Sequence, residues 1–261
     1  MLNIAITAGG TSEQIDGVRR LTNVSTGLLG WHCLEAVMEQ LQAAGRHDFR
    51  VTYILTDTAY RGVLSDRQHP FVDFLPVSDA ESVYHAVDEL TSRVPVDFFI
   101  HSMAISDFTI AYAAATDELA REICRLPFSE EEGVTAVREV LEHPSGRYTL
   151  SEKIPSGHNL VLGLKRTKKV IPLIKRNNPA TFLVGFKLLR DVTEEELIRI
   201  ANRLAEENGC DMVFANQLGE LGEENHSGML IRSGEVIARP TGKRAIAAAI
   251  VEEMMKQGGI Q

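Results

Sequence analysis

The segment Asn23-Val24-Ser25-Thr26-Gly27-Leu28-Leu29-Gly30 places hydroxyl and glycine residues directly before a predicted helix. The first turn of a helix has unpaired backbone N–H groups and a partial positive charge, which together favour a bound anion. Glycine has no Cβ atom, so a phosphate can approach its backbone closely. The pattern indicates a phosphate site, or else Ser25 and Thr26 are simple helix N-caps. It is neither a GxGxxG fingerprint nor a Walker sequence.

Two other charged groups stand where a ligand could bind. Asp107 follows the apolar run at residues 96–102, and a carboxylate just beyond a buried strand can contact a ligand, bind Mg²⁺ or merely cap a turn. The basic residues at 165–169 and 175–176 fit a triphosphate if they open onto the same pocket; on one helix they are more typical of a solvated face. His101 is interpreted as structural, because no metal ligands accompany it.

The elements that position these residues alternate between strand and helix. Short apolar runs predict strands at residues 2–7, 50–56, 96–102, 182–186 and 211–215. Amphipathic or capped segments predict helices at residues 28–44, 79–93, 116–124, from 193 onward, and 241–256. This alternation predicts an α/β fold, a Rossmann-like, mostly parallel open sheet with helices on both faces, which binds ligands beyond the carboxyl ends of its strands.

Two features depart from that alternation. Residues 112–155 contain one short predicted helix and otherwise no clear pattern, so we expect a protruding arm or flap within a single domain spanning residues 1–261. Residues 229–231 and 235–237, joined by Arg232-Ser233-Gly234, predict a C-terminal hairpin.

The composition excludes some function classes. The net charge is −9, from 36 acidic and 27 basic residues, which disfavours a nucleic-acid-binding or membrane-binding protein. We expect no transmembrane helix and no secretory signal, because no apolar run is long enough and the N-terminus lacks a basic region. Cys33, Cys124 and Cys210 suit neither a disulfide framework nor zinc, so they are expected to be free thiols in a reducing cytoplasm.

Several motifs resemble the phosphopantothenate–cysteine ligase family, specifically its stand-alone bacterial form. Residues 7–27 are similar to the family signature T-x-G-G-T-x-E-x-I/L-D-x-V-R-x-(I/L)-x-N-x-S-(S/T)-G. Residues 101–108 resemble its second motif, which ends in an Asp after a small residue. Residues 183–188 and 211–216 resemble two further motifs. The resemblance extends from residue 2 to about residue 250.

The resemblance implies a two-step ligation in coenzyme A biosynthesis. The carboxylate of 4′-phosphopantothenate is first activated by a nucleoside triphosphate, with CTP expected and ATP as the alternative, and pyrophosphate is released. The amine of L-cysteine then displaces the nucleoside monophosphate. The family also implies Mg²⁺, a homodimer and, in some systems, a separate decarboxylase.

The resemblance assigns roles to individual residues. Those assigned to the phosphates are Gly10, Ser25, Gly27 and Gly30. Those assigned to the rest of the nucleotide are Asp107, Lys153, Arg166, Thr167, Lys168, Phe186 and Asn216, with Asp107 also contacting magnesium. Those assigned to the acid substrate are Arg19, which would reach across a dimer interface, together with Asn23, Ala104 and Asp107. Those assigned to catalysis are Asn23, Arg19 and the flap lysine Lys153.

The sequence departs from the family pattern on the nucleotide side. Lys153 is the one flap lysine that matches, and Lys168 stands where many members have proline. Arg203 stands in for a lysine that usually points toward the base, and Gln217 replaces a carboxylate. These departures affect nucleotide preference more than the reaction. Two alternatives are an NAD(P)-dependent oxidoreductase and a non-catalytic nucleotide-binding module. The first predicts a glycine fingerprint, which this sequence lacks.

Overall fold

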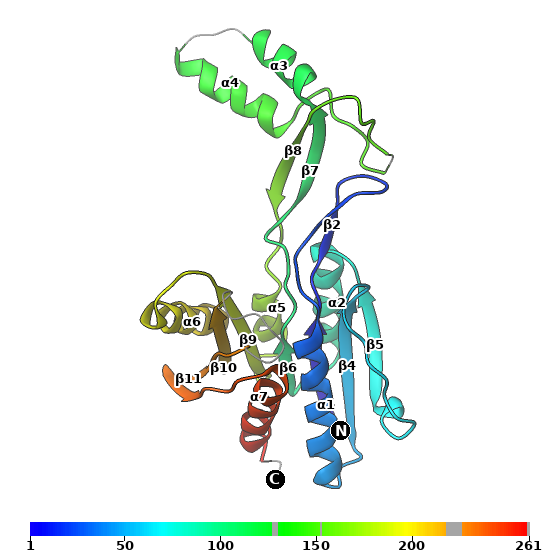
Figure 1. The fold of residues 1–261 in the computed structure, drawn as a ribbon, viewed down its shortest axis with the longest axis vertical. Coiled ribbons are helices and arrows are strands. Elements are labelled where there is room, and N and C mark those ends of the chain that lie inside the picture. The colour runs from blue at the N-terminus through cyan, green and yellow to red at the C-terminus, as the bar shows by residue number, and fades with distance from the viewer. Residues whose placement is uncertain (127–129, 152, 218–225, 260–261) are drawn as a thin grey trace. The chain divides into compact units, whose positions relative to one another are not determined.

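The computed structural model describes residues 1–126, 130–151, 153–217 and 226–259 (Figure 1). The chain forms two compact units. Unit 1 comprises Met1–Thr11, Val24–Ile105 and Lys169–Gln261, and unit 2 comprises Ser12–Asn23 and Ser106–Lys168. The predicted arm at residues 112–155 lies within unit 2. Among the described residues, no helix has both the length and the apolar character needed to cross a membrane.

Unit 1 contains an eight-stranded sheet with five helices (Figure 1). Its strands are β1 (Leu2–Ala8), β4 (Phe49–Thr56), β5 (Val72–Val77), β6 (Phe98–His101), β9 (Phe182–Leu189), β10 (Met212–Gln217), β11 (Met229–Arg232) and β12 (Glu235–Ala238). Its helices are α1 (Leu28–Ala43), α2 (Ala80–Arg93), α5 (Ile171–Asn177), α6 (Glu194–Asn208) and α7 (Lys243–Gln257), with the short 3-10 helix η1 (His69–Phe71).

The order of the strands creates a switch point at the centre of the sheet. The order is β12-β11-β10-β9-β6-β1-β4-β5, and all pairs from β10 to β5 are parallel, whereas β11 and β12 pair antiparallel. From β1 the parallel strands continue in both directions, through β4 to β5 on one side and through β6 and β9 to β10 on the other. This is the Rossmann arrangement, and ligands of such sheets bind beyond the carboxyl ends of the two central strands. The predicted fold class and the C-terminal hairpin are confirmed.

Helices cover both faces of the sheet, as the continuous burial of residues 4–8 in β1 requires. Ile4 and Ile6 of β1 belong to the apolar cluster that includes α1 and α7. Ala5, which points to the opposite face, belongs to the cluster that includes α2 and α5. A third cluster joins α6 to β10 and β11. The central strand is therefore buried on both sides, which accounts for its continuous apolar sequence.

Unit 2 is built from two antiparallel pairs of strands and two helices. The elements are β2 (Ser12–Gln14) with β3 (Arg20–Thr22), β7 (Phe108–Ala115) with β8 (Leu160–Arg166), α3 (Thr116–Cys124) and α4 (Glu130–Glu142). The Tyr112 hydroxyl donates to the carbonyl of Leu141, 2.6 Å away, and so joins β7 to α4. A Cβ atom at Gly163 would lie 2.1 Å from the Tyr112 ring, so glycine in β8 makes room for this ring.

The predicted elements agree with the structure where the local pattern is strong. Helix α3 has the predicted bounds, and Asp79 caps α2 by accepting a hydrogen bond from the backbone N–H of Ser82. The sequence did not predict β2, β3, β5, β7, β8, α4 or α5. Strand β5 contains Pro76, and β7 is rich in alanine, a residue that is depleted in strands.

The helical interpretation of the basic cluster is wrong for residues 165–169, whereas Lys175 and Arg176 do lie in helix α5. Lys165 and Arg166 end strand β8, and the next helix, α5, begins only at Ile171, with Pro172 in its first turn. Proline is favoured there because the first N–H groups of a helix have no intrahelical acceptor. The basic residues at 165–169 thus lie at the end of strand β8 and in the loop after it, and they do not form one helix face.

Candidate functional site

The turn after β1 is held tightly against the end of β4. Gly9 has a φ angle of +100°, and a Cβ atom there would lie 2.1 Å from the Thr56 Oγ1 atom and 2.9 Å from the Ala59 Cβ atom. Only glycine satisfies both the positive φ and this separation. Thr56 is 3% exposed, and its hydroxyl has no hydrogen-bond partner among the described residues.

Helix α1 begins beside the same turn. Its N-cap is Gly27, with a φ angle of +70°, and a Cβ atom there would lie 3.0 Å from the Gly9 nitrogen. No side-chain hydrogen bond caps this helix, and no acidic residue lies in its first turn. The Ser25 and Thr26 hydroxyls make only long contacts, both 3.4 Å, to the nitrogens of Gly27 and Leu28. Neither hydroxyl occupies the N-cap position, so the simple capping alternative does not describe this helix.

Gly30 has a packing role that the sequence did not reveal. A Cβ atom at this position would lie 2.7 Å from the Ala8 Cβ atom and 2.9 Å from the Ser102 Oγ atom. Glycine therefore allows α1 to approach β1 and the end of β6 closely. Its assignment to the phosphates stays a prediction.

Hydrogen bonds join the loops after β1 and β6. The Ala104 N–H donates to the Gly9 carbonyl at 2.9 Å, and the Thr11 N–H donates to the Ala104 carbonyl at 3.0 Å. Gly10 and Ala104 form a parallel bridge between the two loops. The Ser102 hydroxyl also donates to the Thr7 carbonyl, 2.6 Å away. Two predicted site residues, Gly10 and Ala104, are thus brought together at the switch point.

His101 belongs to the same buried network. Its Nδ1 atom lies 3.0 Å from the Thr7 hydroxyl, which also accepts a hydrogen bond from the Met103 N–H at 3.2 Å. The Thr7 hydroxyl can therefore donate to a neutral imidazole. Burial lowers the pKa of His101 from 6.5 to about 4, because desolvation disfavours the charged ring. Its burial and its contact with Thr7 agree with a structural role for His101, which stays a prediction.

Phe186 and Asn216 lie on neighbouring strands at the other half of the sheet. The Phe186 ring packs against Phe214, with centroids 5.9 Å apart. Asn216 is 7% exposed, and its Nδ2 atom lies 3.3 Å from the Nε2 atom of His226. Arg203, the stand-in for a base-directed lysine, donates instead to Glu207 on the surface of α6 at 2.7 Å.

Asp107 and the basic strand end lie together in unit 2. The Thr167 N–H donates to the Asp107 carbonyl at 3.0 Å, and the Thr167 hydroxyl donates to the Ser106 carbonyl at 2.6 Å. Arg166 pairs with Phe108 in the β7–β8 register, so its main chain is adjacent to Asp107. The side chains of Asp107 and Arg166 are exposed. Lys168 follows directly in sequence.

A second group in unit 2 connects the turn between β2 and β3 with the flap. Arg19 pairs with the buried carboxylate of Asp16 and also donates from Nη2 to the Ile154 carbonyl at 3.0 Å. Lys153, the predicted flap lysine, is exposed and precedes Ile154. Asn23 is half-buried one residue beyond β3. Asp16 is a residue that sequence reasoning missed, because its partner at Ile154 is remote in sequence.

The predicted site residues divide between the two units. Unit 1 carries Gly10, Ser25, Gly27, Gly30, Ala104, Phe186 and Asn216. Unit 2 carries Arg19, Asn23, Asp107, Lys153, Arg166, Thr167 and Lys168.

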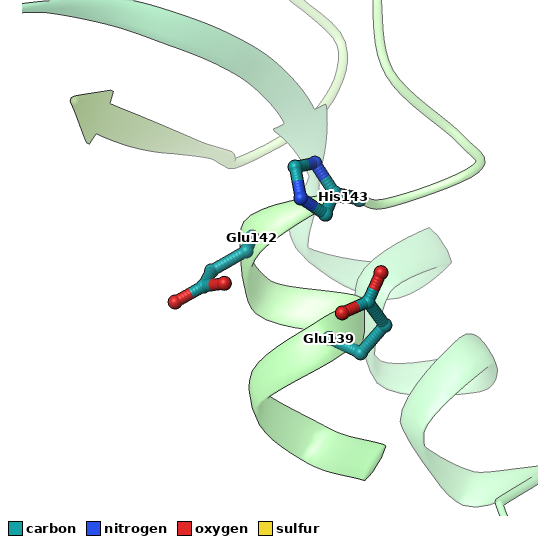
Figure 2. Close-up of side chains that lie close together, drawn as sticks. All are labelled: Glu139, Glu142 and His143. Atoms are coloured by element: carbon teal, nitrogen blue, oxygen red, sulfur yellow. The ribbon is translucent and has the colours of Figure 1, made fainter. Parts of the chain in front are cut away.

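One further group of possible metal ligands lies at the end of α4 (Figure 2). Ligand atoms of Glu139, Glu142 and His143 lie within 4.8 Å of one another, and all three residues are exposed. Among the described residues this is the one cluster of three such groups. Exposed acidic groups are ordinarily solvated, so the cluster does not by itself define a metal site.

The comparisons with known proteins agree with the motifs. The family model described as the DNA/pantothenate metabolism flavoprotein C-terminal domain matches residues 1–132 and 146–257. The chain belongs to this family. The family resemblance found in the sequence is thereby confirmed.

Relatives of this family member include a coenzyme A biosynthesis bifunctional protein CoaBC from Thermococcus kodakarensis. The two are 28% identical over 97% of this chain, but over 51% of that protein. The chain thus spans about half the length of this curated relative.

Solved structures share the fold. The crystal structure of the DNA/pantothenate metabolism flavoprotein from Streptococcus pneumoniae has a TM-score of 0.76 and 29% identity, covering 98% of this chain and 100% of that one. A Cab2 mutant in complex with phosphopantothenate-cysteine has a TM-score of 0.58 and 17% identity, covering 98% of this chain and 86% of that one.

The buried imidazole of His101 predicts a specific dependence of stability on pH. Between pH 6.5 and about 4 the unfolded chain binds a proton on this residue that the folded chain does not, so stability falls as the pH is lowered through that window. The full effect is about 3 kcal/mol. Urea unfolding of His101→Gln should show a correspondingly weaker loss of stability in this range than the unsubstituted protein.

His85→Gln is the matched control, because His85 is exposed on α2 beside Glu81. It should leave the pH dependence essentially unchanged. If the His101 ring titrates near pH 6.5 in an NMR experiment on the unsubstituted protein, the proposed neutral, buried state is wrong.

Proposed function

We propose that the chain is a phosphopantothenate–cysteine ligase. In the first step a carboxylate oxygen of 4′-phosphopantothenate attacks the α-phosphorus of CTP, so an acyl-cytidylate forms and pyrophosphate leaves. In the second step the amine of L-cysteine attacks the acyl carbon. The amide bond forms, the amine loses a proton, and CMP leaves with the electron pair of the broken C–O bond. Activation is needed because a free carboxylate is a poor acyl donor.

The observation that carries this proposal is the corner of unit 1 where Gly9 and Gly27 meet the start of α1. An uncapped helix N-terminus with no acidic residue in its first turn attracts an anion through its N–H groups and its dipole. The corner lies at the carboxyl end of β1, beside the switch point of the sheet. The buried Thr56 hydroxyl, which has no hydrogen-bond partner in the described part of the chain, lies against it. These features favour a bound phosphate chain.

The proposed roles in unit 1 follow from this corner. Gly10, Ser25 and Gly27 hold the triphosphate, and Gly30 contributes by bringing α1 close to β1. Ala104, fixed to the Gly9 turn by its backbone N–H, contacts the pantothenoyl group. Phe186 and Asn216 contact the nucleotide from β9 and β10. Rigid placement of phosphate-binding N–H groups supplies catalysis through positioning and charge stabilisation.

The proposed roles in unit 2 belong to its charged and amide side chains. Asn23 stabilises the acyl-cytidylate, and Arg19 reaches the acid substrate across a dimer interface. Lys153 neutralises the triphosphate, because an ammonium group beside a desolvated phosphate forms a charge-assisted hydrogen bond. Arg166, Thr167 and Lys168 bind nucleotide at the end of β8.

Mg²⁺ is proposed to accompany the nucleotide. Mg²⁺ usually retains several water ligands and binds through one or two carboxylates plus substrate phosphates. The exposed carboxylate of Asp107, beside Arg166 and Thr167, fits that donor set as a single protein ligand. Bound there, the ion would neutralise charge on the phosphates.

The names of the relatives support the same reaction class. The CoaBC relative is named for coenzyme A biosynthesis, and the Cab2 structure contains phosphopantothenate-cysteine, which is the product of the proposed reaction. CTP is proposed as the nucleotide and ATP as the alternative. We also propose that the protein works as a cytoplasmic homodimer and can associate with a separate decarboxylase.

The direct test is pyrophosphate release by the purified protein with Mg²⁺. We expect release from CTP when phosphopantothenate is present, and sustained turnover to phosphopantothenoylcysteine when cysteine is added. Replacing CTP with ATP tests nucleotide preference. Nucleotide binding without pyrophosphate release would show a non-catalytic module, and reduction of NAD(P) would indicate an oxidoreductase instead.

Asn23→Ala should separate the two steps. Loss of one polar group that stabilises the transition state in which cysteine attacks the acyl-cytidylate should lower product formation by about a hundredfold. The first step should persist, so the measurement is a burst of pyrophosphate about equal to the enzyme, together with trapped acyl-cytidylate. Asn202→Ala on α6 is the control and should behave as the unsubstituted protein. Undiminished product formation by Asn23→Ala would contradict the assigned role.

Lys153→Met should weaken the step that uses the triphosphate. Removing a charge-assisted contact to phosphate costs about 1.5–3 kcal/mol, so kcat/KM for CTP should fall roughly 10- to 100-fold. The control is Lys256→Met, which removes an equal charge that is paired with Glu252 on α7. Kinetics that match the control would show that Lys153 does not act on the nucleotide.

A further inference from the structure

The side chain that the proposed mechanism leaves without a role is the carboxylate of Asp16. It lies in the turn between β2 and β3, where the N–H groups of Ile15 and Asp16 both donate to the Arg19 carbonyl. Asp16 is 1% exposed. A buried carboxylate is costly unless its oxygens are paired and hydrogen-bonded, so its partners indicate its purpose.

The two oxygens of Asp16 have different partners. Oδ1 accepts from the backbone N–H groups of Val18 at 2.9 Å and Arg19 at 2.8 Å, which closes the turn. Oδ2 accepts from Nε and Nη2 of Arg19 at 2.9 and 2.5 Å, and from the N–H of Ile154 at 3.1 Å. The turn itself needs only Oδ1. Oδ2 accepts hydrogen bonds from the Arg19 side chain and from Ile154, which is 138 residues away in the sequence.

Arg19 completes the connection. Its Nη2 atom also donates to the Ile154 carbonyl at 3.0 Å, so the N–H and the carbonyl of Ile154 are both held by the Asp16–Arg19 pair. Ile154 is 2% exposed, which adds apolar burial at the same point. Lys153 is the preceding residue, so these contacts fix the backbone from which its exposed side chain extends.

Charge on Asp16 is essential to this arrangement. All its contacts come from donors, and hydrogen bonds to an ionised acceptor are stronger than those to a neutral one. The Arg19 guanidinium holds the pKa of Asp16 well below its usual range, with further lowering from the N–H groups of Val18, Ile154 and Arg19. The carboxylate therefore remains ionised, and Arg19 keeps Nη1 without a partner among the described residues.

We propose that Asp16 is a positioning residue that fixes Arg19 and the backbone of Lys153 relative to each other through the Ile154 peptide. The inference rests on the proposed function, in which Arg19 and Lys153 act on substrate and nucleotide. Asp16 contacts neither ligand itself. It reduces the conformational freedom that the Arg19 side chain and the Lys153 backbone would otherwise lose on binding.

Asp16→Asn is the selective test. The amide oxygen can still accept from Val18 and Arg19 and close the turn, but the amide NH₂ would face the donors of Arg19 and Ile154. We expect hydrogen exchange of the Ile154 amide to accelerate about tenfold or more. The control Glu118→Gln, which breaks the exposed Glu118–Arg121 pair in the same unit, should leave this amide unchanged.

A double-mutant cycle then tests whether Asp16 acts through Lys153. Asp16→Asn and Lys153→Met should each lower kcat/KM for CTP, and the double variant should lose less than the product of the two single effects. A purely structural role would give multiplicative losses in the double variant. That result would overturn the proposal, as would faster exchange at Ile154 with unchanged kinetics.

Failure of the inference and failure of the proposed function are distinguishable. If the unsubstituted protein releases no pyrophosphate, the function is wrong whatever the exchange data show. If Asp16→Asn leaves the Ile154 amide as protected as before, the inferred link from Asp16 to the Ile154 peptide is wrong, whatever the activity of the variant. If this variant fails to fold, hydrogen exchange of the unsubstituted protein tests the connection instead. The Ile154 amide should then exchange more slowly than the amides of residues 156–158, and equal rates would overturn the inference.

Discussion

The close approach of α1 to the turn after β1 depends on three positions that tolerate no side chain. At Gly9 a Cβ atom would meet Thr56, at Gly27 it would meet the Gly9 nitrogen, and at Gly30 it would meet Ala8. These contacts hold the N–H groups in the first turn of α1 at the carboxyl end of β1. A site preorganised in this way needs little rearrangement to bind charge, which is the main requirement for activating a carboxylate with a nucleotide.

The buried network around Thr7 extends this rigidity to β6. The Thr7 hydroxyl contacts His101 and Met103, while its carbonyl accepts from Ser102. Ala104 is then fixed to Gly9 by a backbone hydrogen bond. Burial beside this network lowers the pKa of His101, because desolvation disfavours the charged ring.

Local sequence patterns predicted the fold class because most strands of the parallel sheet and most helices of unit 1 have a clear pattern of their own, although β5 and α5 were missed. They also pointed to Gly27 and Gly30, but not to the reasons for them: the positive φ of Gly27 and the packing of Gly30 against Ser102 are properties of segments brought together by the sheet. Strands β7 and β8 were missed because their pairing, rather than their composition, defines them. Asp16 was missed for the same reason, since its partner Ile154 cannot be found from spacing.

The account depends most on the claim that the start of α1 and the turn after β1 bind the triphosphate. A crystal structure of the protein with CTP and Mg²⁺ tests this most directly. The account predicts phosphate oxygens within hydrogen-bond distance of the backbone N–H groups around Gly10 and Gly27. A well-ordered nucleotide bound elsewhere, with these N–H groups hydrated, would contradict it.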